Sequence, residues 1–428
     1  MKRTKLIKTL KKIIVSKPFI ILICVLIVYL LLKLGIGVSE QDSILDLIEF
    51  NVVISVGITT VVAVFVNWIS NYLNKYLEEG LKLTESYEAL IKRYKKEKFM
   101  PGKIITKQKG LYVVKDVDCP IVELADKPSS LDIIVNKENF KLDPIIVTNA
   151  NKLISAHENS KINNKDILRL DHFDKDVNGK ITLEISMTNF YNTLLTNRAM
   201  DYELTKKMSV REMFEYGPHL NTFKLSKMAN GVGVSSIVLT KDGYYVMLYR
   251  GMKNPTGKHQ ISICNSTLNF YLSNKNTLIK NADSSQKLSK ELTDDLIYES
   301  ILNGLIVKLH YPTKGEYALS KKDYQLIGMV RNIKEGGKPE LFYVVKTKYT
   351  KQGLLDRMKH WYEEDYNSEN KDEVRPKKKE NEDTYKAVFI NKESIESCSL
   401  YCLKTGGKRY NMHFNALYFA QKIMTDSI

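Results

Sequence analysis

The sequence predicts an α+β protein in which an N-terminal two-helix transmembrane hairpin precedes a cytoplasmic domain built on a mixed sheet. Three observations support this prediction: two apolar runs at 18–32 and 50–69, a following body of short alternating strands, and one long amphipathic helix expected at 284–310. A helix that crosses a bilayer needs about 20 largely apolar residues. Each of the two runs is therefore long enough to span a membrane.

The charges around the two runs predict the orientation of the hairpin. The segment before the first run is basic and has no acidic residue (Lys2, Arg3, Lys5, Lys8, Lys11, Lys12 and Lys17), whereas the connector is acidic (Glu40, Asp42, Asp46 and Glu49). The positive-inside bias places the N-terminus in the cytoplasm and the connector outside. This predicts a two-pass protein of the bacterial inner (cell) membrane with both termini in the cytoplasm. A cleaved signal peptide is the alternative, because Gly35 and Gly37 offer small residues for cleavage.

The periodicity of apolar residues and the positions of Pro and Gly predict five regions along the chain. They are a basic amphipathic arm at 1–17, the transmembrane hairpin at 18–74, a juxtamembrane helix at 75–100, a β-rich part of the cytoplasmic body at 101–180, and a final domain at 181–428 with a charged insert at 363–383.

The composition narrows the class of ligand. The formal net charge of +16 favours anionic partners such as lipid headgroups or phosphorylated ligands. The five cysteines (Cys24, Cys119, Cys264, Cys398 and Cys402) form no Cys-x-x-Cys pair, which argues against a disulfide framework or a structural zinc. The histidines show no metal spacing, and the chain has no P-loop and no Gly-x-Ser-x-Gly elbow. We therefore expect no metal and no cofactor.

One short motif imitates a calcium site. Residues 174–179 copy the first half of an EF-hand loop, but the twelfth position is Ile185 instead of the bidentate glutamate. The residues that follow Gly179 alternate in the manner of a strand. We therefore predict an Asn-Gly β-turn at this point.

The region 181–415 has a recognisable order of elements. A strand, an Asp-Gly turn and a strand that ends in Arg250 precede the long acidic helix, and a Gly-Gly-Lys-Pro turn joins the two strands after it. This order resembles the Nudix fold. It is most similar to the Nudix-like domains that follow two transmembrane helices in effectors of bacterial CBASS antiphage systems, the SMODS-associated Nudix group. The segments SSIVLTKDGYYVMLYR, GKPELFYVV and TNFYNTLLTNRAMDYEL carry the similarity.

The resemblance implies a membrane-embedded effector of antiviral defence. Such a protein would bind a cyclic oligonucleotide second messenger through its Nudix-like domain, form a homo-oligomer, and disrupt the lipid bilayer by a pore or a more general lesion. No nucleic-acid polymer is expected as a partner.

A catalytic Nudix box, G-x5-E-x7-R-E-U-x-E-E-x-G-U, holds Mg²⁺ through glutamates that converge from adjacent helical turns. One register places Glu299 at the central glutamate, but Tyr298 then replaces the arginine. The other keeps Glu291, Asp294 and Asp295 but replaces the arginine with a lysine. Neither register supplies the upstream Gly and Glu, so we predict a degenerate box and no enzymatic activity.

Two alternatives remain open. The first is a membrane-tethered, Mg²⁺-dependent Nudix hydrolase that cleaves nucleoside diphosphate derivatives through Glu291, Asp294 and Asp295. The second is a non-catalytic membrane scaffold that recognises lipid headgroups or a partner.

Candidate ligand contacts follow from residue chemistry and from expected positions near the sheet. Arginine, lysine and histidine can contact phosphates, and aromatic rings can stack on bases. The candidates are Arg250, Lys258, His259 and Arg331 for phosphates, and Tyr249 or Phe270 for base stacking. The alternative for each is an ordinary surface or core residue.

Overall fold

The computed structural model describes residues 86–108, 111–126, 130–154, 164–205, 208–250, 259–273, 275–280, 284–364 and 386–425. The chain divides into two compact units, 1–80 and 81–428, and all the described residues belong to the second unit.

The predicted transmembrane hairpin is not supported by the structure. No helix within the described ranges is long and apolar enough to cross a membrane. The longest of these helices, α10 (Lys290–Leu309), carries six charged residues and packs on sheets. This finding overturns the predicted fold class with its two-helix hairpin, the two-pass inner-membrane localisation, and the pore that depended on them. The apolar runs at 18–32 and 50–69, like the arm at 1–17, lie outside the described residues.

The largest element is a mixed sheet of twelve strands in the order β11-β8-β14-β13-β2-β1-β16-β17-β18-β10-β9-β15. A further pairing between β8 and β9 closes ten of these strands into a ring. The pairs β8–β14 and β10–β18 are parallel, and the other pairs are antiparallel. The strands are β1 (Phe99–Gln108), β2 (Leu111–Asp126), β8 (Gly233–Leu239), β9 (Tyr245–Tyr249), β10 (Gln260–Ser262), β11 (Cys264–Thr267), β13 (Tyr324–Asn332), β14 (Lys338–Lys346), β15 (Lys386–Ile390), β16 (Ile395–Cys398), β17 (Cys402–Thr405) and β18 (Lys408–Met412).

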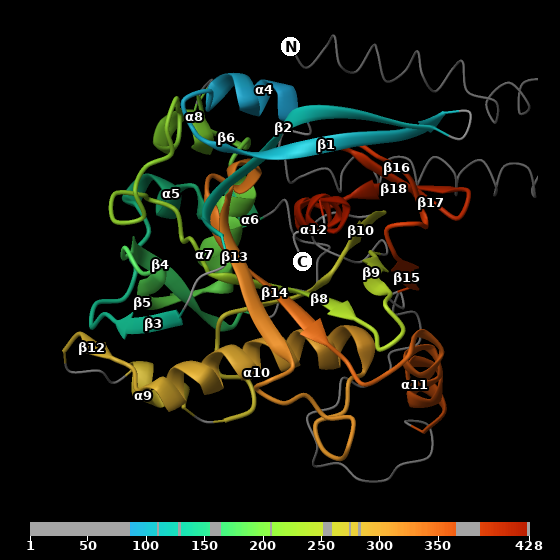
Figure 1. Cartoon of the computed structure of the whole chain (residues 1–428). Coiled ribbons are helices and arrows are strands. Elements are labelled where there is room, and N and C mark those ends of the chain that lie inside the picture. Colours follow the sequence, from blue (N-terminus) through green and yellow to red (C-terminus); the bar gives the residue numbers. More distant parts are fainter. Residues whose placement is uncertain are drawn as a thin grey trace, which may run out of the picture. The chain divides into compact units, whose positions relative to one another are not determined.

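The helix α12 (Phe414–Met424) lies inside this ring and is buried along its whole length (Figure 1). Tyr418 stacks on Phe342 of β14 with ring centroids 4.0 Å apart. Gln421 Oε1 accepts the backbone N–H of Lys103 in β1 at 2.7 Å, and Asn415 reaches β8. The side chains of α12 therefore contact three different strands of the ring, β14, β1 and β8.

A second sheet has four strands in the order β12-β3-β5-β4, and β6 and β7 form a small hairpin. The β4–β5 connection confirms the predicted Asn-Gly turn: Asp176 Oδ1 accepts the N–H groups of Asn178 and Lys180, and Gly179 has φ +79°. These strands are β3 (Ser130–Val135), β4 (Asp166–Lys175), β5 (Lys180–Asn189), β6 (Glu203–Thr205), β7 (Met208–Ser209) and β12 (Gln286–Lys287).

The helix α10 runs along strands of both sheets and joins their cores (Figure 1). Ser289 caps its N-terminus by accepting the Leu292 N–H, and its buried face packs on strands of both sheets. It begins six residues later than the predicted helix at 284–310. The other helices are α4 (Tyr87–Arg93), α5 (Pro144–Thr148), α6 (Ala150–Ile154), α7 (Phe190–Leu195), η3 (Asn197–Ala199), α8 (Val210–Phe214), α9 (Asn276–Lys280), η4 (Ile333–Glu335) and α11 (Lys351–Glu364).

The predicted juxtamembrane helix at 75–100 is only partly present. Residues 87–93 form α4, but the strand β1 begins at Phe99, and residues 75–85 lie outside the described part of the chain. The Pro101-Gly102 pair lies within β1. A Cβ atom at residue 102 would lie 2.6 Å from Gln421 Oε1 of α12, so the Gln421 side chain packs directly against the β1 backbone at this glycine.

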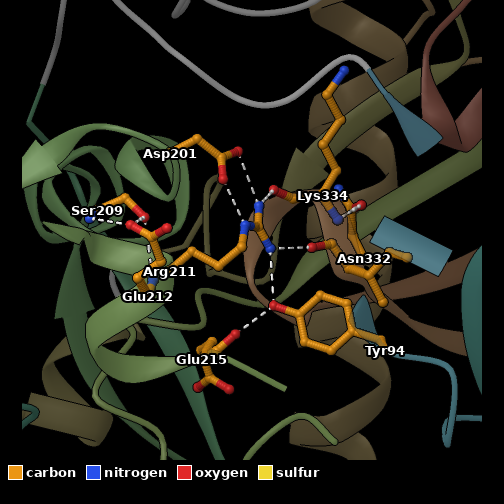
Figure 2. Close-up of polar contacts among 9 residues, drawn as sticks. Tyr94, Asp201, Ser209, Arg211, Glu212, Glu215, Asn332 and Lys334 are labelled. Atoms are coloured by element: carbon orange, nitrogen blue, oxygen red, sulfur yellow. Dashed lines mark hydrogen bonds and ion pairs between the residues drawn. The ribbon is translucent and has the colours of Figure 1, made fainter. Parts of the chain in front are cut away.

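A buried arginine joins α8 to η4 and α4 (Figure 2). Arg211 is 1% exposed, and its guanidinium bonds both carboxylate oxygens of Asp201 at 2.6 and 3.1 Å. It also donates to the backbone carbonyls of Ile333 and Lys334 and to the hydroxyl of Tyr94. Burial of a guanidinium is tolerated when its donors are satisfied. Arg211 therefore fixes three segments that are distant in sequence.

The enclosure of α12 can be tested with Leu417→Ala. Leu417 is fully buried, so the truncation should leave a cavity and lower the free energy of unfolding by about 3 kcal/mol. Leu278→Ala is the matched control, because Leu278 is 48% exposed. Urea titration followed by circular dichroism measures both variants. Equal losses in the two variants would contradict the enclosed position of α12.

Candidate ligand-binding site

The carboxylates that the sequence assigns to a degenerate Nudix helix lie along α10. Asp295 bonds Lys275 at 2.6 Å and Lys321 at 2.7 Å. Hydrogen bonds from these two ammonium groups hold the pKa of the Asp295 carboxyl below its usual value. Glu299 is buried, and its Oε2 accepts the backbone N–H groups of Leu272 and Ser273. Both carboxylates therefore have partners within the protein.

The other two carboxylates of this helix differ in exposure. Glu291 is exposed, and Asp294 is half-buried. Across the described ranges, no group of three or more His, Cys, Asp or Glu residues is placed to hold a metal ion. The arrangement on α10 therefore differs from the three converging carboxylates of a catalytic box.

Three of the predicted ligand contacts lie together where β9 ends and β10 begins. The hydroxyl of Tyr249 is 2.8 Å from Nδ1 of His259. Arg250 lies between them in the chain and is 5% exposed. The backbones of Arg250 and His259 also bond, with His259 N–H donating to the Arg250 carbonyl at 2.9 Å.

The remaining predicted contacts are elsewhere. Arg331 is buried, donates to the carbonyls of Asn221 and Gly337, and lies over the ring of Phe223 at 4.3 Å. Phe270 is 3% exposed and belongs to the core between the sheets. Lys258 lies outside the described residues. The six predicted contacts are therefore not gathered in one site.

A larger site was not predicted from the sequence. It is a pocket of about 690 Å³, which we call the basic pocket, formed by the loop after β3, the loop before β8, strands β4 and β5, and the segment before β12. Its lining has five cationic and two acidic side chains: Lys137, Lys141, Arg169, Lys224, Lys227, Glu138 and Asp171. Its volume is within the usual range for pockets that bind small molecules.

Arg169 of β4 organises the basic pocket. Its NH2 group donates to the carbonyls of Phe223 and Ser226 at 2.9 Å each, which holds the loop before β8. Its guanidinium also lies 4.7 Å from the ring of Phe140, which belongs to the loop after β3. One side chain therefore contacts both loops. The loop after β3 contributes Lys137 and Lys141 to the pocket lining, and the loop before β8 contributes Lys224 and Lys227.

Asp171 partners Arg169 in an ion pair and completes this arrangement. It also accepts hydrogen bonds from Asn136 Nδ2 at 2.9 Å and from Ser186 Oγ at 3.0 Å. These bonds connect β4 with β5 and with the loop after β3. The polar groups at the base of the pocket are thus held by one another, whereas the four lysines are exposed.

The sequence offered only a weak signal for this pocket. The four lysines stand in two short polar loops about 85 residues apart, Lys137 and Lys141 in one and Lys224 and Lys227 in the other. Lysines in such loops are usually solvated. Arg169 stands in an alternating strand and gives no motif. The tertiary pairing of β3, β4 and β5 is what brings these loops together.

The ion pairs of Asp295 can be tested by pH-dependent unfolding of Asp295→Asn. A lowered pKa in the folded state means that the carboxylate stabilises the fold above its unfolded pKa and that this contribution is lost as the pH falls through the folded pKa. We expect the variant to be less stable than the wild type by about 0.5 kcal/mol at pH 7, the size typical of partly exposed pairs. The difference should shrink at pH 3. The control Glu291→Gln alters an exposed carboxylate on the same helix, and an equal loss there would contradict the assignment.

Comparison with known proteins supplies no relative for this chain. No protein-family model matches the sequence, and no curated protein matches it significantly. The resemblance to Nudix-like domains therefore stays a prediction, and the ligand has to be inferred from the geometry of the basic pocket.

Proposed function

We propose that this protein is a sensor that binds a phosphate-bearing nucleotide of the cyclic oligonucleotide class in the basic pocket. The observation that supports the proposal is the pocket itself, which combines a volume of about 690 Å³ with five cationic side chains against two acidic ones. Asp171 and Arg169 pair with each other, which leaves the four lysines against the single acidic group of Glu138. A ligand that enters the pocket therefore meets an excess of positive charge.

The four lysines suit a ligand with more than one phosphate. They stand in two separate loops on either side of Arg169, which contacts both loops. Lysine ammonium groups are compact charges on flexible stems, so they can reach phosphates without a rigid geometry. A ring of alternating phosphates and bases presents its charges at separate points and could engage both loops at once.

The pocket also offers groups for the bases of such a ligand. Phe140 is partly exposed and lies on Arg169, so that its ring is held in place. Aromatic rings stack on bases without strong sequence preference. The lining also includes the side chains of Asn136, Asn139, Ser284 and Ser285, which can donate to and accept from base edges.

The partners of the α10 carboxylates support sensing as the function. Asp295 is bonded to two lysines and Glu299 to two backbone amides, so both groups serve the fold. Binding energy can then be used to shift the protein between two states, in proportion to the difference in affinity of the ligand for each. Self-association of the ligand-bound chain stays a prediction.

The proposal is tested by calorimetric titration of the full chain with cyclic di-AMP, cyclic di-GMP and cyclic GMP–AMP. At least one should bind saturably, with lower affinity as the salt concentration rises because exposed charges are screened. Lys224→Glu should weaken that binding about tenfold or more, since it reverses a charge in the pocket wall.

Lys314→Glu is the matched control, because Lys314 is an exposed lysine outside the pocket. Equal affinities for the two variants would remove the basic pocket as the site. The failure of all three ligands to bind would overturn the assignment of the ligand class. Conversion of a ligand by the wild type in the presence of Mg²⁺ would favour the hydrolase alternative.

A further inference from the structure

One continuous segment of the chain, residues 215–227, has one end in the wall of the basic pocket and the other end on α4. We call it the linking segment. Its last residues, Lys224, Leu225, Ser226 and Lys227, line the pocket. Its first residues follow α8 and pack on the C-terminal end of α4.

The contact with α4 is close. The hydroxyl of Tyr94, the residue that caps α4, donates to the backbone carbonyl of Glu215 at 2.5 Å (Figure 2). The guanidinium of Arg93 lies over the ring of Tyr216 at 5.4 Å. A Cβ atom on Gly217 would lie 2.8 Å from the Arg93 carbonyl, and Gly217 has φ +100°. Only glycine fits at this point, so the segment and the end of α4 leave no space between them.

The contact at the pocket end is equally direct. Arg169 donates to the carbonyls of Phe223 and Ser226, and the Ser226 hydroxyl donates to Glu215 Oε1 at 2.8 Å. Glu215 Oε2 accepts the backbone N–H of Asn221 at 2.9 Å. Glu215 therefore bonds the pocket end through its carboxylate and the α4 end through its carbonyl.

The burial of Glu215 makes these bonds costly to break. The residue is 1% exposed, and a buried carboxylate that loses its donors has no water to replace them. A displacement of Ser226 would therefore be opposed unless Glu215 and the segment around it moved too. Arg211 donates to the Tyr94 hydroxyl at 3.1 Å and to the carbonyls of Ile333 and Lys334 in η4, so it connects the same point to η4.

We infer that Glu215 couples the basic pocket to α4. An anionic ligand that binds in this pocket, between the linking segment and the loop after β3, then changes the stability of α4. This inference rests on the proposed function, because it needs a ligand in that pocket. The linking segment is the element that the two sites share. The coupling is reciprocal: if the bound ligand changes the stability of α4, then a change in the stability of α4 must change the affinity for the ligand.

The test uses the full chain and the cyclic dinucleotide that binds it most tightly. Tyr94→Phe removes the hydroxyl that joins α4 to Glu215, and the ligand dissociation constant should change about fivefold or more. Tyr401→Phe is the matched control. It also removes a tyrosine hydroxyl that bonds α4, but at Glu88 in the first turn, away from the linking segment. The control should bind the ligand as the wild type does.

A second measurement needs no variant. Hydrogen–deuterium exchange of the wild type should show a change of about fivefold or more in the exchange rates of the Leu90 and Tyr94 amides when the ligand is added. Both amides donate within α4, to Ser86 and Leu90 carbonyls. Ser226→Ala should bring that change close to zero, because it removes the hydroxyl that reaches the Glu215 carboxylate.

The outcomes separate the two claims. Binding that depends on Lys224, together with equal affinities for Tyr94→Phe and Tyr401→Phe and unchanged exchange in α4, would overturn the coupling and leave the proposed function standing. Absence of any binding that depends on Lys224 would overturn both. If Tyr94→Phe proves unstable in thermal unfolding, the exchange experiment on the wild type decides alone.

Discussion

The enclosure of α12 by a closed ring of ten strands is the constraint on which most of the structure depends. A helix buried on every face needs apolar side chains or partners for its polar groups. Most side chains of α12 are apolar, and its buried polar side chains bond the ring, although Gln421 Nε2 has no hydrogen-bond partner among the described residues. Its aromatic residues pack against β14, while Asn415, Gln421 and Lys422 reach β8, β1 and β2. Each of the ten strands of the ring therefore has a neighbour on both sides, and β11 and β15 are the two end strands of the twelve-stranded sheet.

Two buried arginines connect this ring to the parts of the chain around it. Arg211 holds the turn between β13 and β14 to α8 and α4, and Arg169 holds the two loops of the basic pocket. Both donate to backbone carbonyls, whose positions depend on the local chain path more than on side-chain rotamers. An arginine can do this because its donors form a rigid planar fork. Buried charges of this kind add little net stability, so their main effect is to select one arrangement of the loops.

Two of the acidic residues of α10 are bonded within the fold. The acidic residues of this helix resemble those of a catalytic box in sequence. In the structure, Glu299 accepts the backbone N–H groups of Leu272 and Ser273, and Asp295 forms ion pairs with two lysines. The charged pocket lies at loops from three other segments. A fold can supply a scaffold on which the functional site is placed elsewhere, and the site must then be argued from its own residues.

The local elements could be predicted from the sequence because they depend on short-range patterns. Alternation predicted the strands β8, β9, β13 and β14, and the positions of Asp, Asn and Gly predicted the Asp-Gly and Asn-Gly turns. The transmembrane hairpin was predicted from the same kind of local signal, the hydropathy of two runs, and no described helix supports it. The end of the helix predicted at 75–100 was wrong because β1 pairs with β2 from Phe99 onward.

Only the tertiary structure decided the rest. The closure of the ring, the position of α12 inside it, the burial of Arg331 and Phe270, and the meeting of four lysines around Arg169 all depend on contacts between residues far apart in the chain. Sequence periodicity indicates which face of a helix or strand is apolar, but it does not indicate which other helix or strand packs on that face. The sequence alone therefore determined the basic net charge of the chain and its strands, turns and long helix. The packing decided that four lysines gather around one pocket.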